Sequence, residues 1–277
     1  MKKILCLLLV VLCLTGCGLK SSNVPTLKTG KEMCDMYKYA RKVVFDKYNK
    51  KEYGFKWKEG EDVSQDGNGK IKLFKNDDEV YILSRKQIYA NEDCSFMFSN
   101  CASLETLELK NFNTSNVKNM RGMFYLSSSL ESLDVSNFDT SNVTDMSDMF
   151  HGCYELTSLD LGNFNTSNVT NMKFMFETCV KLTSLNVRNF DTSKVRNMNG
   201  MFCGCVNFRS LDLSNFDTGS LKIMASMFEN CCNLETLDIT NFNIKEVDTE
   251  VMFKDCHSLK NVIYPEEVDI SKYQIVY

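Results

Sequence analysis

The chain has 277 residues, a formal net charge of −4, thirteen cysteines and two histidines. A hydrophobic content of 43% suits a folded protein, whereas two histidines are few for acid–base catalysis or for a histidine metal site. The charge is uneven: positions 18–60 hold eleven basic and five acidic residues, and positions 61–277 hold nineteen and thirty-one. The acidic remainder argues against nucleic-acid binding. The basic segment either favours anionic lipid head groups or is simply a solvated charged helix.

The first residues read as an export signal. Lys2 and Lys3 precede an apolar run, Ile4 to Leu14, that is too short to span a membrane comfortably. The run ends in "LTGC", which resembles the lipobox of bacterial lipoproteins, in which the cysteine is lipidated and becomes the mature N-terminus. We therefore expect a signal peptide over residues 1–16 and lipidation at Cys17, with an ordinary secretory signal as the alternative.

The next segments predict a tether and a small cap. Residues 17–29 are small and polar, as in a flexible tether. The apolar residues from Met33 to Tyr48 recur at three- and four-residue intervals and predict one helix. "IKLFKNDDEVYILS" predicts a β-hairpin, so residues 30–93 are expected to form a helix-plus-hairpin α+β cap. "DVSQDGNG" partly matches a calcium loop, but Leu73 stands where the bidentate Glu belongs, which favours a simple turn.

Residues 94–262 are about six copies of one 26-residue unit. Its frame is C-x-x-L-x-x-L-x-L-x-N-F-x-T-S-N-V-x-x-M-x-x-M-F, and a fixed period of this length indicates stacked units that share one core. In "LTSLDLGNF" the leucines are expected to point inward from a short strand, with Asp160 outward. "VTNMKFMFETC" predicts one or two helical turns that close each coil. Residues 263–277 would cap the far end.

The repeat resembles a known family. "SLDVSNFDTSNVTDMSDMF" and "SLDLGNFNTSNVTNMKFMF" are similar to the 26-residue repeat of BspA-like leucine-rich-repeat surface proteins of bacteria. The resemblance implies an α/β repeat fold, a right-handed leucine-rich-repeat-like solenoid of short parallel strands and short helical turns, displayed on the cell surface. Family members are linked to adhesion and host contact. This sequence departs from the general leucine-rich pattern by placing Phe where Asn or Cys is usual, so an inward asparagine ladder through Asn137 and Asn163 is expected instead.

Ten cysteines remain beyond Cys17, and several recur at the 26-residue period. Stacked coils would bring their Cα atoms within the range that a disulfide permits, although parallel side chains would have to swing together. The alternatives are a column of small buried hydrophobic side chains, which we favour, and a metal cluster around Cys203, Cys205, Cys231 and Cys232, whose spacing is not that of a zinc knuckle. We expect no metal and no cofactor.

One column of charged residues is a candidate ligand-binding face. The outward strand position of successive copies, here called the acidic column, holds Glu108, Asp134, Asp160, Asn186, Asp212 and Asp238. Stacked carboxylates repel one another, so a basic partner or cations would stabilise them. Duplication of one harmless solvated residue would produce the same column.

These features predict a surface lipoprotein that binds a partner, not an enzyme. No phosphate-binding loop, G-x-S-x-G or H-E-x-x-H motif occurs. We expect an exported, lipid-anchored and surface-exposed protein whose repeats bind a protein or cell-surface ligand of unknown identity, and the acidic column favours a basic one. The alternative is a structural or thiol/metal-binding surface lipoprotein without a macromolecular partner.

Overall fold

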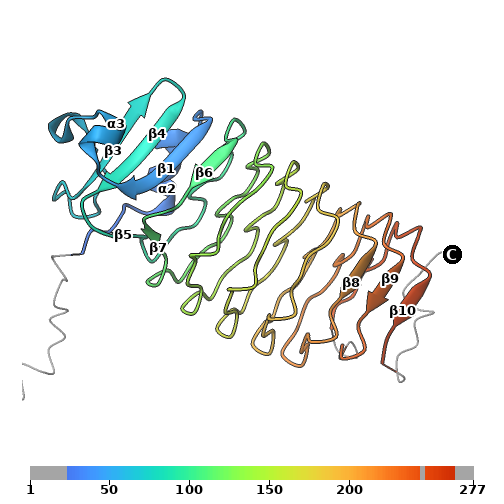
Figure 1. The fold of residues 1–277 in the computed structure, drawn as a ribbon. Coiled ribbons are helices and arrows are strands. Elements are labelled where there is room, and N and C mark those ends of the chain that lie inside the picture. The colour runs from blue at the N-terminus through green and yellow to red at the C-terminus, as the bar shows by residue number, and fades with distance from the viewer. Residues whose placement is uncertain (1–23, 244–246, 266–277) are drawn as a thin grey trace, which may run out of the picture.

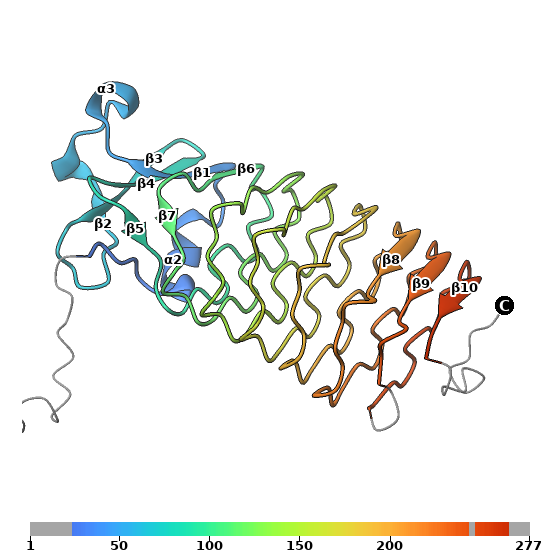
Figure 2. The same cartoon turned by 60° about the horizontal axis from the view of Figure 1, so that its bottom comes forward.

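The computed structural model describes residues 24–243 and 247–265. It is elongated, with a small N-terminal domain at one end and a row of similar coils that leads away from it (Figure 1). A view turned by 60° shows the same row, with the strands β8 (Ser210–Asp212), β9 (Thr236–Asp238) and β10 (Asn261–Ile263) stacked at the far end (Figure 2). The signal peptide, Cys17 and the final residues 266–277 lie outside the described residues.

The N-terminal domain is built on a mixed sheet. Its helical elements are α2 (Gly30–Tyr37), α3 (Lys50–Tyr53) and a 3-10 turn at Trp57–Glu59, and its strands are β1 (Lys42–Lys47), β2 (Glu61–Asp62), β3 (Ile71–Asn76), β4 (Glu79–Ser84) and β5 (Ile88–Tyr89). Strands β3 and β4 pair antiparallel, which confirms the predicted hairpin. Asp77 has a φ of 50° in the turn between them.

The single long helix predicted from Met33 to Tyr48 is wrong in its second half. Helix α2 ends at Tyr37, and the residues Lys42–Lys47 form strand β1. Val43, Val44 and Phe45 are buried on both faces of that strand. Their spacing alone fits a helix, but two β-branched residues in a row favour a strand when neighbouring strands can pair with them on either side.

Strand β1 joins the domain to the coils. It pairs in parallel with β4 on one side and with β6 (Thr106–Glu108), the strand of the first coil, on the other. The sheet order is therefore β2-β3-β4-β1-β6, and β1 covers the edge at which the stack of coils begins. The residues predicted as a tether are also attached from Pro25 onward, since Leu27 is fully buried and Tyr89 donates its backbone N–H to the Pro25 carbonyl.

The coils stack through parallel backbone pairs. The remaining strands are β7 (Phe112–Asn113), β8 (Ser210–Asp212), β9 (Thr236–Asp238) and β10 (Asn261–Ile263). A column of single parallel bridges continues through every coil at a spacing of 26 residues, until Ile223 pairs with Asp248 across 25. The last copy is thus one residue shorter, as its sequence indicates. The bridge column runs through Asp93, Asn119, Asp145, Asn171, Asn197, Ile223 and Asp248.

The predicted helical turns do not form in the described coils; the segment is a series of tight turns. The N–H groups of Met172, Phe174 and Phe176 bond to carbonyls of the next coil, whereas that of Met175 bonds back to Met172. Alternate N–H groups are therefore used between coils, which a helix would not allow. This geometry requires left-handed backbone at two positions per coil, for example at Phe174 and Thr178.

Apolar columns fill the interior. One column of phenylalanine rings stacks almost face to face, with centroids 5.6 Å apart between Phe150 and Phe176 and 5.7 Å between Phe176 and Phe202. The methionines of the frame, such as Met172 and Met175, are fully buried. Each coil therefore supplies the same side chains to one shared core, which no single coil could enclose.

Candidate binding surface

The strand side of the coils carries two parallel columns of polar side chains. In the "SLDLGNF" segment Leu159 and Leu161 are buried and Asp160 is exposed, as predicted from the alternation. Two residues before each member of the acidic column lies an exposed hydroxyl, and this hydroxyl column consists of Thr106, Ser132, Ser158, Ser184, Ser210 and Thr236. We call the surface that holds both columns the strand face. Its side chains are short, so a partner could approach the backbone closely.

The acidic column has a structural role that the sequence analysis missed. The Asp134 Oδ1 accepts a hydrogen bond of 3.0 Å from the Ser136 N–H, and the Asp160 Oδ1 accepts one of 2.9 Å from the Gly162 N–H. Asp238 accepts from Thr240 in the same way. Each side chain therefore caps the turn that follows its strand, as Asp and Asn commonly do. The repeated D-x-S, D-x-G and N-x-R spacings were the signal.

Three members of the acidic column add no uncompensated charge, because two are paired with cations and one is uncharged. Glu108 contacts Lys42 at 2.9 Å and Lys110 at 2.7 Å, and Asp212 contacts Arg188 at 2.7 Å. The hydroxyl and N–H of Ser214, together with Arg188, lower the pKa of Asp212 to about 2. Asn186 carries no charge, and it caps the Arg188 N–H. Uncompensated negative charge on the strand face is thus concentrated at Asp134, Asp160 and Asp238.

The other polar residues of the repeat are turn caps too. In the stretch "NFDTSNVTDMSDMF", Asp139 accepts from the N–H and hydroxyl of Ser141, and Asp145 accepts from those of Ser147. The hydroxyl of Thr140 donates to the Asn165 carbonyl one coil further along. These residue types resemble a reactive site in the sequence, but their oxygens hold the backbone of the coil.

The asparagine ladder exists, but it is not inward. The Asn137 side-chain amide donates to the carbonyls of Leu109 and Phe112, at 2.7 and 3.0 Å. Asn163 makes the equivalent bonds one coil later. Both side chains are exposed, because the buried place belongs to the following phenylalanine.

The cysteine column consists of buried thiols that bond to the backbone. Cys153, Cys179, Cys205 and Cys231 each place Sγ within 3.1–3.2 Å of a phenylalanine carbonyl oxygen in the preceding coil. Ser127, which replaces cysteine in one copy, donates its hydroxyl to the Phe98 carbonyl in the same way. Burial raises the pKa of the Cys153 thiol to about 12. Burial therefore favours the protonated form of these thiols.

The opposite side of the coils, made by the tight turns, holds one mixed cluster. The His151 ring stacks on Tyr125 with centroids 4.7 Å apart, and its Nδ1 lies 2.7 Å from Glu177 Oε2. Arg121 contacts Asp148 at 3.3 Å. Burial raises the pKa of Asp148, although Arg121 opposes that rise.

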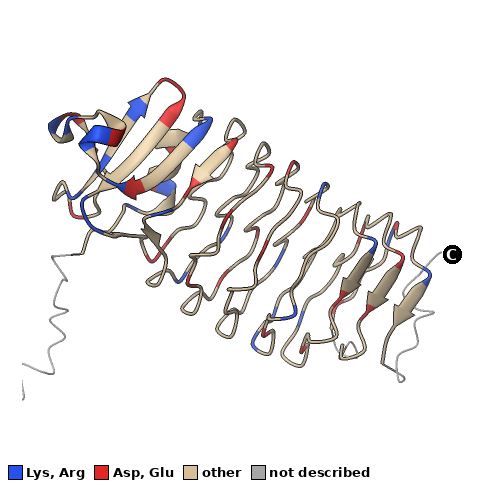
Figure 3. Ribbon diagram, viewed as in Figure 1, with Lys and Arg blue, Asp and Glu red and all other residues tan. Residues whose placement is uncertain are grey.

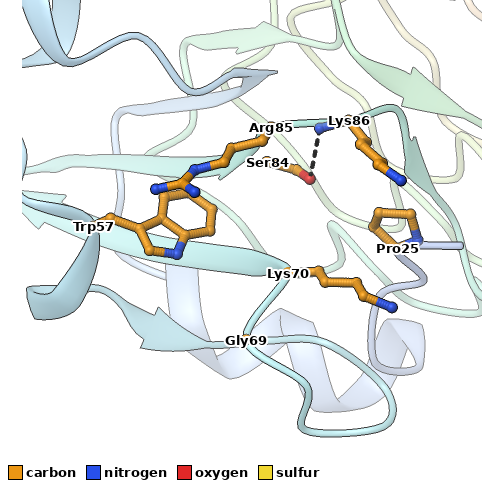
Figure 4. A pocket seen from close by; sticks show the side chains of 7 residues that line it. All are labelled: Pro25, Trp57, Gly69, Lys70, Ser84, Arg85 and Lys86. Carbon is orange, nitrogen blue, oxygen red and sulfur yellow. Dashed lines mark hydrogen bonds between the residues drawn. The ribbon is translucent and has the colours of Figure 1, made fainter. Parts of the chain in front are cut away.

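The N-terminal domain carries many Lys and Arg residues, interspersed with Asp and Glu (Figure 3). Between this domain and the entry of the chain lies a pocket of about 220 Å³, lined by Pro25, Trp57, Gly69, Lys70, Ser84, Arg85 and Lys86. Figure 4 shows the Arg85 guanidinium over the Trp57 ring, at 5.1 Å from its centroid. The partial calcium motif forms a turn, in which Asp62 accepts from Ser64 and Gly69 N–H groups. Within residues 24–243 and 247–265, no group of three His, Cys, Asp or Glu side chains is arranged to hold a metal.

Comparison with known proteins identifies the family of the repeats. Residues 92–185 and 180–275 each match the family described as "Mycoplasma protein of unknown function, DUF285", and together they cover most of the 277 residues. The chain belongs to the DUF285 family. No curated protein matches this DUF285 chain.

Among the solved structures that match this chain, one aligns with it over most of its length. It is a leucine rich cell surface protein from Faecalibacterium prausnitzii A2-165, which aligns with 93% of the DUF285 chain and 94% of its own at 11% identity. The TM-score of 0.21 is too low for this likeness to support an argument about fold or function. Among the described residues, no helix is long and apolar enough to cross a membrane.

Proposed function

We propose that this chain is an exported surface lipoprotein, anchored through a lipid on Cys17, whose coils form a leucine-rich-repeat-type right-handed solenoid that binds a macromolecular partner. The charged start, apolar run and "LTGC" of the first seventeen residues support the anchor. The resemblance of the repeat to BspA-like surface proteins supports display on the cell surface. An extended stack of this kind offers a long surface for binding.

The observation that carries the binding proposal is the pair of columns on the strand face. Short hydroxyls and carboxylates lie side by side along successive coils, so they form a continuous polar surface, which Arg188 and Lys110 join through their contacts with Asp212 and Glu108. Asp134 and Asp160 lie on adjacent coils, bridged through Ser132 and Ser158. A partner with a row of basic groups would reduce the repulsion between these carboxylates.

The thiol alternative has weaker support. Metal binding requires thiolates, whereas burial raises the pKa of thiols such as Cys153 and Cys179 and their Sγ atoms already donate to carbonyl oxygens. A purely structural surface protein is the remaining alternative, and it is the outcome if no partner is captured.

The anchor is tested by Cys17→Ala in the full chain. The variant is expected to leave the membrane fraction and appear in the soluble fraction or the medium. Unchanged retention in the membrane fraction would reject the lipid anchor.

The strand face is tested by replacing Asp134, Asp160, Asp212 and Asp238 with Asn. Asn keeps the oxygen that caps each turn, so the substitution removes charge and leaves the fold intact. Once a partner has been captured with residues 17–277, its association rate is expected to fall about ten-fold at low salt, with a smaller loss at high salt.

The matched control removes the same charge from turn caps outside the acidic column. It replaces Asp139, Asp145, Asp191 and Asp217 with Asn, and each of these also accepts a hydrogen bond from a residue two positions on. The control is expected to change the association rate less than two-fold, because its charges lie outside the acidic column and would face the partner less directly. Equal losses in the two variants would show that binding depends on net charge and would move the site away from the strand face.

A further inference from the structure

The pocket in the N-terminal domain combines three cations with one aromatic side chain. Lys70 precedes strand β3, and Arg85 and Lys86 follow strand β4, so the hairpin brings the three to one opening. The seven residues that line the pocket include no carboxylate. Its volume of about 220 Å³ is large enough for a phosphate group with part of its ester.

Arg85 is held in place by aromatic rings. Its guanidinium lies 5.1 Å from the centroid of Trp57 and 6.0 Å from that of Tyr48, and these two rings contact each other edge to face at 4.9 Å. A stacked guanidinium keeps its N–H donors free at the edges, in the planar arrangement that suits two oxygens of a phosphate. Figure 4 shows Lys86 and Lys70 on the other side of the opening, next to Pro25.

The pocket also lies where the chain enters the domain. Pro25 lines it, and the Pro25 carbonyl accepts a bond of 2.8 Å from the Tyr89 N–H, which fixes the entry point. Seven residues lie between Cys17 and Pro25, so Pro25, which lines the pocket, would lie within about 29 Å of Cys17 even if this stretch were fully extended. A shorter path through that stretch would bring the pocket closer to the membrane surface.

We propose that the pocket formed by Trp57, Lys70, Arg85 and Lys86 binds the phosphate group of an anionic lipid head group. Its placement at the membrane rests on the proposed anchor at Cys17, whereas its chemistry does not. The site would hold the N-terminal domain against the bilayer and direct the coils outward. Trp57 is suited to this position, because tryptophan favours the interface between head groups and acyl chains.

The experiment uses residues 17–277 with Cys17→Ala, so that no lipid contributes to binding. Vesicles of phosphatidylcholine with 30% phosphatidylglycerol are compared with pure phosphatidylcholine, by co-sedimentation and by the emission of Trp57. This residue is the single tryptophan of the chain, so its emission reports the pocket directly. Binding and a shift in emission are expected with the anionic vesicles alone.

Two triple variants separate the pocket from general charge. Lys70→Gln, Arg85→Gln and Lys86→Gln together are expected to lower vesicle binding roughly a hundred-fold, at about five-fold per cation. The matched control, Lys50→Gln, Lys51→Gln and Lys58→Gln, removes the same charge from exposed lysines of the same domain that do not line the pocket and is expected to lower it less than five-fold. Equal losses would overturn the assignment to the pocket.

The remaining outcomes are also decisive. No binding of the parent protein to anionic vesicles, or binding without a change in Trp57 emission, would overturn the proposal. A response to inorganic phosphate or glycerol phosphate without a response to vesicles would assign the pocket to a free phosphate compound and overturn the lipid assignment. The Cys17→Ala fractionation tests the anchor separately, since this experiment contains no anchored protein.

Discussion

The N-terminal domain and the coils enclose their apolar side chains in different ways. In the domain, each aromatic ring has its own set of neighbours: Phe55 stacks on Phe74 at 4.7 Å and lies tilted against Tyr81 at 5.3 Å. In the coils, Phe176 stacks on the equivalent phenylalanine of each neighbouring coil, Phe150 and Phe202, and the interplanar angle is 5° in both pairs. The packing environment of a residue in the coils is therefore repeated along its column, whereas the packing environment of a residue in the N-terminal domain occurs only once.

This difference explains where the sequence was informative. In the repeats, each inward position occurs several times in the sequence at a spacing of 26 residues, so the leucine, phenylalanine and methionine columns could be predicted. In the N-terminal domain each position occurs once. There the spacing of apolar residues from Met33 to Tyr48 fits one helix as well as it fits the observed helix α2 followed by strand β1. The sequence could not show that β4 and β6 were available on either side of β1.

The largest expected effect comes from breaking the register of the coils. Deleting residues 164–176, half a period, would place a turn segment where the strand of the next coil belongs, and we expect the protein to lose cooperative unfolding. Deleting residues 164–189 removes one whole coil and rejoins equivalent positions, so folding is expected to persist with a modest fall in Tm. Thermal unfolding followed by circular dichroism measures both, and similar curves would contradict a stack of equivalent coils.

The next largest effect tests the equivalence of positions within a column. Phe150→Ala and Phe176→Ala each remove a fully buried ring that stacks on a neighbour at both sides. Each is expected to cost about 3–5 kcal/mol in the free energy of unfolding. The cost of such a substitution depends on how far the surrounding side chains can collapse into the cavity. Because the two sites have equivalent surroundings, their costs should agree within about 1 kcal/mol.

Urea denaturation measures these free energies. Phe55→Ala is the contrasting variant in the N-terminal domain, where the ring is only half-buried and a smaller cost, about 1–2 kcal/mol, is expected. A difference of several kcal/mol between the two coil variants would show that the coils are not energetically equivalent.

The turn side of the coils was the part that periodicity predicted least well. The spacing from Val169 to Phe176 fits a helical turn, but the N–H groups bond to the next coil and two residues per coil take left-handed backbone. Glycine occupies only some of these positions, for example Gly200 and Gly204, while Phe174 and Thr178 occupy the equivalents one coil earlier. Glycine thus marks these positions in three copies, through Gly122, Gly152 and the pair Gly200 and Gly204, and the other copies lack this signal. The outward position of the acidic column could be predicted from the sequence, but its role in capping turns became evident only from the hydrogen bonds in the structure.

Substitutions at two equivalent left-handed positions are expected to change the free energy of unfolding by smaller amounts and in opposite directions. Gly204 has a φ of 70°, and a Cβ there would lie 2.9 Å from Thr178 Cγ2, so Gly204→Ala is expected to cost about 1–2 kcal/mol. Thr178 has a φ of 55°, which is strained for a β-branched residue, so Thr178→Gly is expected to stabilise by up to about 1 kcal/mol. Urea denaturation of both variants checks the signs, and a destabilised Thr178→Gly would show that its side-chain contacts outweigh the strain.

The smallest effect on stability, and the sharpest contrast between the two regions, concerns a thiol at their junction. Cys34 lies on helix α2 with its Sγ 3.2 Å from the Ser99 carbonyl oxygen and 3.5 Å from the Ser99 hydroxyl. Cys101, the first member of the cysteine column, places its Sγ 3.6 Å from the same carbonyl. A hydrogen bond from Cys101, helped by one from the Ser99 hydroxyl and opposed by burial, lowers the pKa of Cys34 to about 6.

Cys34 is therefore expected to react with iodoacetamide far faster than Cys153 or Cys179 at pH 7, since only the thiolate attacks and burial raises the pKa of the other two. The sign follows from the lowered pKa: the rate at Cys34 should reach half its maximum near pH 6 and stay high as the pH rises. In urea the midpoint should return to about 8.5, the value of a free cysteine. Peptide mapping by mass spectrometry identifies the alkylated residue at each pH.

Cys101→Ala removes the hydrogen bond that lowers the pKa of Cys34 most, so it should move the midpoint upward, whereas Cys179→Ala in the middle of the column should leave it unchanged. A midpoint near 8.5 in the folded parent protein would mean that the junction does not activate Cys34 and that it behaves as an ordinary thiol.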